Sequence, residues 1–296
     1  MVALNFARPR QTERLDLSAV LQGASFEVMP RTLAKVEALA GLWAPGTTVY
    51  LAHIDGTSFE EMLSAAERLH GAGYEVMPHI PARSVPNQAI LEEWVGAYRD
   101  EAAVDSVLLL AGGRAEPAGP FDSSVQLAET GLFDGFRRVH FAGHPEGNRD
   151  IDGDGGTRLV DEAALWKQGW AGRSDAEVAL VTQFVFEADP VIAWMERLRA
   201  AGVTLPVHVG VAGPTRLQTL IKYAIACGVG PSLRVLQKRA GDLTKLMVPH
   251  RPDDVIAALA GWSAAHPGMG LDRFHVFPLG GIAASAEWLR EEQSGP

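Results

Sequence analysis

The chain has 296 residues, 47% of them hydrophobic, a formal net charge of −10 and one cysteine. The acidic balance argues against a nucleic-acid partner, because neutralising phosphates requires a basic face. Cys227 cannot form an internal disulfide or a cysteine-based zinc site by itself, which fits a reducing compartment. With no apolar run of about 18 residues and no signal-like N-terminus, we expect a cytoplasmic protein without a membrane partner.

Apolar runs of strand length alternate with amphipathic stretches of helical period along most of the chain. Several of these stretches follow an N-cap residue such as Ser58 or end at a glycine such as Gly71. The eight expected strands cover residues 25–30, 47–54, 74–80, 106–111, 137–144, 178–186, 206–212 and 273–279. The expected helices cover residues 31–41, 58–71, 88–102, 123–130, 158–171, 190–201, 215–227 and 282–291.

Eight continuous apolar runs, each followed by a helical stretch, predict a closed parallel sheet that is buried on both faces, a (β/α)8 TIM barrel. Residues 1–20 are polar and irregular and are expected to form an N-terminal arm, with one catalytic barrel over residues 21–296. Residues 231–268 are expected to add helical material before the eighth strand. An open doubly wound sheet is the alternative, but no G-x-G-x-x-G motif follows an early strand.

Two polar residues inside apolar strands are the first candidates for function. Glu27 lies between apolar neighbours, and burying an ionised carboxylate without partners is costly, so it either faces solvent or is kept for a perturbed pKa. Gln183 lies in the sixth apolar run, where its amide either bonds to neighbouring backbone or binds a ligand. The active residues of TIM barrels lie at the carboxyl ends of the strands, which favours function for both.

Other patterns have competing interpretations. Five residues could supply metal ligands, but they come from three strands with no fixed spacing, so we predict no metal. Residues 150–155 begin like a calcium loop, yet a strand precedes them and the twelfth residue is not Glu. The glycine turns at 210–215 and 280–281 would suit either a phosphate or close packing. No lysine lies on an expected strand, which argues against Schiff-base chemistry. The five are His53, Asp55, His79, His144 and Glu146.

Two segments together resemble the methylenetetrahydrofolate reductase family. Residues 26–30, Phe-Glu-Val-Met-Pro, resemble the family's Phe-Glu-Phe-Phe-Pro, and residues 181–187, Val-Thr-Gln-Phe-Val-Phe-Glu, resemble its Ile-Thr-Gln-Phe-Phe-Phe-Asp. The resemblance spans nearly the whole chain and implies the same barrel fold. Further residues in the family's order are Thr57, Pro78 to Ile80, Phe141 to Glu146, Gly210, Phe274 and His275.

The resemblance implies reduction of 5,10-methylenetetrahydrofolate to 5-methyltetrahydrofolate with NAD(P)H, usually through FAD, in one-carbon metabolism and methionine biosynthesis. Glu27 would match the general acid that protonates N10 as the ring opens, which near neutral pH requires a raised pKa. Gln183 would match the amide that binds the pterin and the nicotinamide in turn, beside Phe184. Leu217 replaces a Phe that packs on these ligands, so apolar contact is kept and stacking is lost.

The expected flavin site departs from the family. Its Arg-Gly-Asp after the fourth strand is replaced by Gly112, Gly113 and Arg114, and its helical Lys aligns with Gln168, beside Lys167. Losing two cations that face a pyrophosphate is expected to weaken binding by several kcal/mol, at roughly 1.5–3 kcal/mol per charged hydrogen bond. Arg114 could reach back toward the ligands in compensation. The cofactor positions implied by the resemblance are Thr57, His79, Gly112, Gly113, His144, Asp161, Lys167 and Gln168.

Two cofactor hypotheses follow. Either FAD binds weakly in an altered pose, or hydride passes directly from the nicotinamide to the folate, whose opened ring is an electrophilic iminium. Two other functions are kept as alternatives: a different folate-linked one-carbon enzyme, such as one for methyl transfer or demethylation, and a folate-binding barrel without redox chemistry. The choice between NADH and NADPH, and whether the chain forms a homo-oligomer, are left open.

Overall fold

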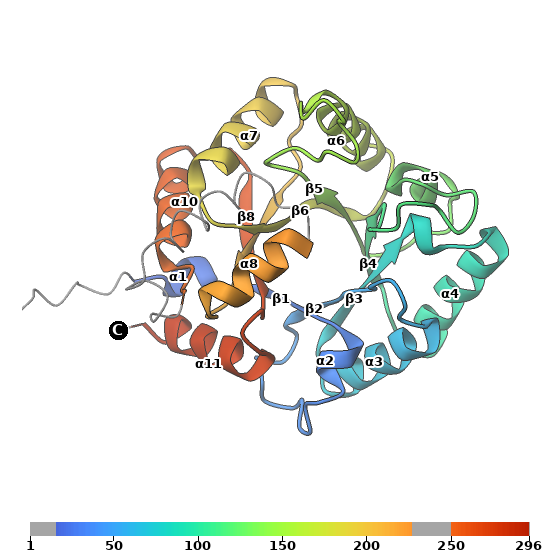
Figure 1. Ribbon diagram of the computed structural model, residues 1–296, viewed down its shortest axis with the longest axis horizontal. Helices are drawn as coiled ribbons and strands as arrows, with labels where there is room; N and C mark the ends of the chain where they lie inside the picture. The colour runs from blue at the N-terminus through green and yellow to red at the C-terminus, as the bar shows by residue number, and fades with distance from the viewer. Residues whose placement is uncertain (1–15, 227–249, 296) are drawn as a thin grey trace, which may run out of the picture.

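The computed structural model describes residues 16–226 and 250–295, in which eight parallel strands form one closed barrel in sequence order. Helices surround the barrel, which Figure 1 shows end-on. The predicted (β/α)8 fold is confirmed, and every expected strand overlaps an observed one. The strands are β1 (Ser25–Val28), β2 (Thr48–Leu51), β3 (Glu75–Pro81), β4 (Ser106–Leu110), β5 (Arg138–Gly143), β6 (Glu177–Val185), β7 (Val207–Ala212) and β8 (Leu271–Phe277).

Most helices also begin and end close to the predicted positions, because capping residues fix their ends. At the start of α3, Ser58 Oγ accepts the Glu61 N–H while the Glu61 carboxylate accepts the Ser58 N–H, a reciprocal cap. The helices are α1 (Ser18–Leu21), α2 (Pro30–Leu33), α3 (Phe59–Gly71), α4 (Gln88–Asp100), α5 (Ser124–Glu129), α6 (Arg158–Ala171), α7 (Ala188–Ala200), α8 (Leu217–Ala226), α10 (Asp253–Ala265) and α11 (Ile282–Gln293), with a 3-10 turn at Ala82–Ser84.

The predicted helix over residues 31–41 is wrong, because only the single turn α2 forms there. Beyond it the chain turns inward so that Trp43 packs on Phe26 and Tyr74, with ring centroids 4.9 and 5.2 Å apart. The Tyr74 hydroxyl also donates to the Leu39 carbonyl at 2.6 Å. Burial of a large aromatic side chain outweighs the helical preference of this segment, which is rich in Ala and Leu.

The two described helices between β7 and β8 occupy different places. Helix α10 packs beside α7 in the outer ring, whereas Figure 1 shows α8 inside that ring, in front of the strands. Leu217 and Leu220 of α8 are buried in a cluster with Phe184 of β6 and Phe277 of β8. Since both phenylalanines lie at or near the carboxyl ends of their strands, α8 covers part of that end of the barrel.

The expected extra helical segment, residues 231–268, is confirmed by α10, while its residues up to 249 lie outside the described part of the chain. The helix that leaves the outer ring is nevertheless α8, which the sequence had assigned to the ordinary ring. At the other end of the chain, Leu17 and Leu21 are already buried in the main core, so the residues just before β1 pack with the barrel. Residues 1–15 of the expected arm lie outside the described residues.

The loop that resembles a calcium site serves as a helix cap. The buried Asp152 carboxylate accepts the N–H groups of Leu159 and Val160, at 2.9 and 3.1 Å, in the first turn of α6. A carboxylate at this position satisfies two free donors and interacts favourably with the helix dipole.

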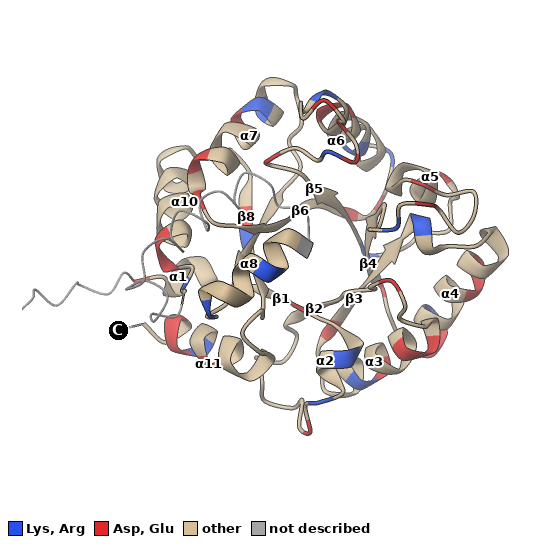
Figure 2. Cartoon of the chain, viewed as in Figure 1, with Lys and Arg blue, Asp and Glu red and all other residues tan. Residues whose placement is uncertain are grey.

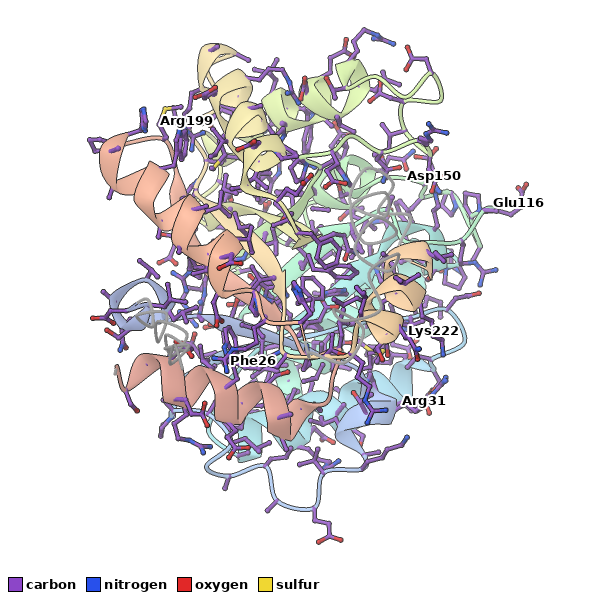
Figure 3. The ribbon with its side chains drawn as sticks, turned by 60° about the vertical axis from the view of Figure 1, so that its left-hand side comes forward. Phe26, Arg31, Glu116, Asp150, Arg199 and Lys222 are labelled. Atoms are coloured by element: carbon purple, nitrogen blue, oxygen red, sulfur yellow. The ribbon has the colours of Figure 1, made fainter. Side chains whose placement is uncertain are left out.

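Replacing Asp152 with Ala is therefore expected to lower the free energy of unfolding by about 1–2 kcal/mol, measured by denaturant titration. Asp150→Ala is the matched control, because Asp150 is exposed in the same loop, as Figure 3 shows, and carries the same charge. Equal effects of the two substitutions would contradict the capping role.

None of the described helices is long and apolar enough to cross a membrane.

Candidate functional site

Three titratable side chains from three strands meet near the carboxyl end of the barrel. Glu27 Oε2 lies 3.3 Å from His79 Nε2 on β3 and 3.5 Å from His275 Nε2 on β8. Both histidines are buried, and the Glu27 side chain is 19% exposed. A hydrogen bond of 2.9 Å between His275 Nδ1 and Ser25 Oγ orients that ring. We call Glu27, His79 and His275 the mouth cluster.

The mouth cluster reverses the predicted direction of the Glu27 pKa. Burial alone would raise that pKa, but the attraction of His79 and His275 outweighs burial and lowers it to about 2. Both charge attraction and hydrogen bonding from the two imidazoles contribute to this lowering. Burial lowers the pKa of His275, which the carboxylate opposes. The expectation of a raised Glu27 pKa is therefore wrong, because two imidazoles face this carboxylate.

A polar network fills the barrel behind the mouth cluster. The Tyr50 hydroxyl is 2.6 Å from His140 Nδ1 and 3.4 Å from His208 Nδ1. His208 Nε2 is in turn 3.0 Å from Asp272 Oδ2. The Tyr50 ring meets the His275 ring edge-on, with centroids 4.5 Å apart. These contacts fix the side chains that lie behind the mouth cluster in one arrangement.

His140, His208 and His275 were not among the site residues expected from the sequence. A usable signal was present, because successive side chains of a strand point to opposite faces. Polar residues recur two apart on several strands, as in Ser25 and Glu27 on β1. This period of two marks an inward-facing polar row within otherwise apolar runs.

Gln183 lies near the end of β6 with an exposed side chain. The pairing of β6 with β7 shifts register between Val181 and Phe184, and such a bulge re-aims the side chain within it. Among the described residues, no group hydrogen-bonds to the Gln183 amide. Opposite it, a Cβ on Gly210 would lie 2.6 Å from the Gln183 carbonyl oxygen, so only glycine permits this approach. Phe184 itself is buried and packs with Leu217 under α8.

Three of the predicted cofactor residues, with Arg114, lie in loops at the same end of the barrel. Gly112 has φ +91°, and a Cβ there would be 2.8 Å from the Pro81 Cβ, so glycine is required for packing; Gly113 follows it. The Thr57 carbonyl accepts a 3.1 Å hydrogen bond from His53 Nε2. Arg114 pairs with Asp55 at 2.7 Å and so ties the loops after β4 and β2 together.

Asp161 and Gln168 form hydrogen bonds with other residues of the helices and loops around the barrel. The Asp161 carboxylate accepts from Thr157 Oγ1 and from Arg197 Nε of α7, at 3.0 and 2.9 Å. Gln168 Oε1 accepts the Thr204 N–H at 2.7 Å in the loop that leads into β7. That loop is at the amino end of the barrel, so Gln168 does not join the mouth cluster.

Lys167 is buried between α6 and β5, where its Nζ donates to the Ala142 carbonyl at 2.8 Å. Burial lowers the Lys167 pKa to about 8. Burial, and then the nearby Lys167 charge, lower the pKa of His144 to about 3. His144 is therefore neutral at physiological pH.

These contacts bear on whether FAD fits. A flavin dinucleotide needs cations or free N–H groups facing its pyrophosphate. Of the cations expected there, Lys167 is enclosed and bonded to Ala142, and Arg114 is paired with Asp55. Both cations expected at the flavin site are therefore engaged within the protein, which disfavours pyrophosphate binding there.

The proposed metal ligands do not come together as one group. His53 bonds to the Thr57 backbone, His79 belongs to the mouth cluster and His144 lies near Lys167. Within residues 16–226 and 250–295, no three His, Cys, Asp or Glu side chains are grouped so that they could hold a metal ion.

No protein-family model matches the chain. The barrel is similar to an uncharacterized protein from Clostridium thermocellum that binds two copies of 5-methyl-5,6,7,8-tetrahydrofolic acid, with a TM-score of 0.60, 10% identity, and coverage of 95% of this chain and 99% of that one. It is more distantly similar to dihydropyrimidinase from Brevibacillus agri NCHU1002, with a TM-score of 0.39, 13% identity, and coverage of 79% of this chain and 50% of that one. At these identities, the first likeness shows the TIM barrel fold alone.

Proposed function

We propose that this barrel binds a folate derivative at its carboxyl end and reduces methylenetetrahydrofolate with NAD(P)H. The observation that carries the proposal is Glu27, held between His79 and His275 on the strand whose sequence resembles that of the reductases. The similar Clostridium thermocellum barrel binds a methyltetrahydrofolate, and the likeness extends over nearly the full length of both chains. Both observations support a folate as the ligand.

The mouth cluster suggests how the proton reaches the substrate. Because Glu27 is ionised at rest, it must first take up the proton that it delivers. In the proposed reaction Glu27 receives this proton through His79, whose Nε2 is 3.3 Å away, and passes it to N10 of the folate as the ring opens. The Glu27 carboxylate, ionised again, stabilises the positive iminium. Hydride from the nicotinamide converts the iminium to the methyl product.

Other residues at this end would bind and orient the ligands. The free amide of Gln183 can donate to and accept from the pterin or the nicotinamide carboxamide. Figure 2 shows basic residues on α8 and α2, and Figure 3 identifies Lys222 and Arg31 on the same side of the molecule. Both are exposed, and they would attract the carboxylates of a folate tail or the phosphates of NAD(P)H.

For the redox step we propose direct transfer from NAD(P)H, because both cations expected at the flavin site are bonded within the protein, Lys167 to Ala142 and Arg114 to Asp55. The purified protein is expected to show no flavin absorbance and to oxidise NADH only when methylenetetrahydrofolate is added, without supplied FAD. The measurements are a visible spectrum followed by NADH oxidation with and without each component.

A flavin spectrum would contradict direct transfer. Calorimetric titration with 5-methyltetrahydrofolate separates the remaining outcomes. Binding without NADH oxidation, with or without added FAD, would indicate a non-redox folate-binding barrel or another one-carbon enzyme. Absence of binding would overturn the folate proposal itself.

A further inference from the structure

A pocket of about 540 Å³ opens at the amino end of the barrel, the end opposite the mouth cluster. Its walls are formed by the first residues of β2, β3 and β5, by β8 near its start, by the loop before β2 and by the last turns of α11. A volume of this size is within the range of roughly 300–1,000 Å³ that is usual for small-molecule sites. No part of the proposed folate chemistry uses it.

The charged residues lining this pocket are three arginines and one glutamate: Arg138, Arg273, Arg290 and Glu75. Glu75 is shared, because it pairs with the buried Arg138 and, at 2.9 Å, with Arg137 outside the lining. Neither Arg273 nor Arg290 pairs with Glu75. The pocket lining therefore carries a net positive charge.

Two arginines of the lining have donor groups with no partner among the described residues. Arg273 binds Asp272 through Nε at 2.9 Å, and the described residues give its two terminal nitrogens no partner. Within the same part of the chain, Arg290 donates to the Leu42 carbonyl at 3.3 Å. Its side chain and that of Arg273 come from α11 and β8, so they reach the pocket from two elements.

Two further lining residues carry buried N–H groups without a partner. Arg138 Nε and Trp43 Nε1 are both shielded from solvent and make no hydrogen bond among the described residues. Arg138 is 7% exposed and Trp43 is 6% exposed. Buried donors in folded proteins nearly always have a partner, which can be a ligand or an ordered ion. Both donors belong to residues that line this cationic pocket.

We propose that this pocket binds a small organic anion through its carboxylate or phosphate group. The terminal nitrogens of Arg273 and Arg290, which lie on β8 and α11, would bind the anionic group. The apolar wall contributed by Leu42 and Leu289 would contact the rest of the ligand. Because catalysis in TIM barrels takes place at the carboxyl end, this is a second binding site separate from the active one.

The test is calorimetric titration of the full chain at low salt, once with succinate and once with inorganic phosphate. At least one anion is expected to saturate a single site, and Arg273→Gln is expected to weaken its binding about tenfold or more. Arg158→Gln is the matched control, since Arg158 is an exposed arginine on α6 outside the pocket. Glu27→Gln should leave the binding unchanged, which separates this site from the folate site.

The result identifies the ligand class as well, because succinate and phosphate probe carboxylate and phosphate recognition separately. If thermal unfolding shows that Arg273→Gln does not fold, Arg290→Gln replaces it with the same expected loss. No saturation by either anion below about 10 mM would overturn the proposal. Equal weakening by Arg273→Gln and Arg158→Gln would overturn it too, since the effect would then be one of overall charge.

Discussion

Replacing Glu27 with Gln is expected to reduce turnover of methylenetetrahydrofolate by about a hundredfold or more while the affinity for 5-methyltetrahydrofolate changes little. Gln keeps the size of the side chain but can neither relay a proton from His79 nor stabilise the iminium by its charge. Turnover is measured by NADH oxidation and affinity by calorimetry. Glu116→Gln is the matched control, because Glu116 is exposed on the loop after β4, as Figure 3 shows.

The same substitution has a signature in the pH dependence of stability. The Glu27 pKa falls from the model-peptide value of 4.5 to about 2 on folding, so the ionised carboxylate stabilises the native state above about pH 4.5. That contribution is lost as the pH falls toward 2. The wild type should therefore lose more stability than Glu27→Gln across this interval in acid denaturation. Unchanged turnover in Glu27→Gln would exclude its catalytic role, whatever the stability result.

The barrel could be predicted from sequence because its strands are buried on both faces and appear as continuous apolar runs. The region after β1 could not, because Trp43 must meet Phe26 and Tyr74, and that contact joins residues distant in the chain. The place of α8 also depends on tertiary contact. Its apolar stripe fits equally well against the outer barrel wall or against Phe184 and Phe277, and periodicity alone does not distinguish the two.

The candidate site could likewise be predicted only where it does not depend on contacts between distant residues. Glu27 and Gln183 stood out because each is a polar residue within an apolar run. The direction of the Glu27 pKa depends on His79 and His275, which only the closure of the sheet brings beside it. Gln168 aligns with a cofactor position of the family, but its amide already accepts the Thr204 N–H. Sequence alignment alone does not reveal that contact.

The second large effect is expected at Lys167, where replacement by Met should raise the free energy of unfolding at neutral pH by about 2 kcal/mol. Lys167 is 4% exposed, and within the described chain it has no carboxylate at ion-pair distance. Burial lowers its pKa from 10.5 to about 8, which corresponds to roughly 3 kcal/mol of cost for the charged form. Met removes that cost and loses one hydrogen bond to Ala142, worth about 1 kcal/mol.

The sign of this effect can be checked with pH. The folded pKa of Lys167 is below its unfolded value, so the unfolded chain binds more protons between about pH 8 and 10.5, and wild-type stability rises over that window. The advantage of Lys167→Met should therefore shrink toward the upper end in denaturant titrations. Lys35→Met is the control, because Lys35 is exposed. A variant less stable than the wild type at neutral pH would contradict the prediction.

A stabilising Lys167→Met would bear on function, because a buried charge that lowers stability is expected where a ligand needs it. Lys167 lies beside the position that the reductase resemblance assigns to a phosphate-binding lysine, and its charge affects His144 at the end of β5. Weaker NAD(P)H binding by the more stable variant would place the ammonium group near the dinucleotide. Unchanged NAD(P)H binding would leave Lys167 with structural contacts only, its bond to Ala142 and its position over the Phe141 ring.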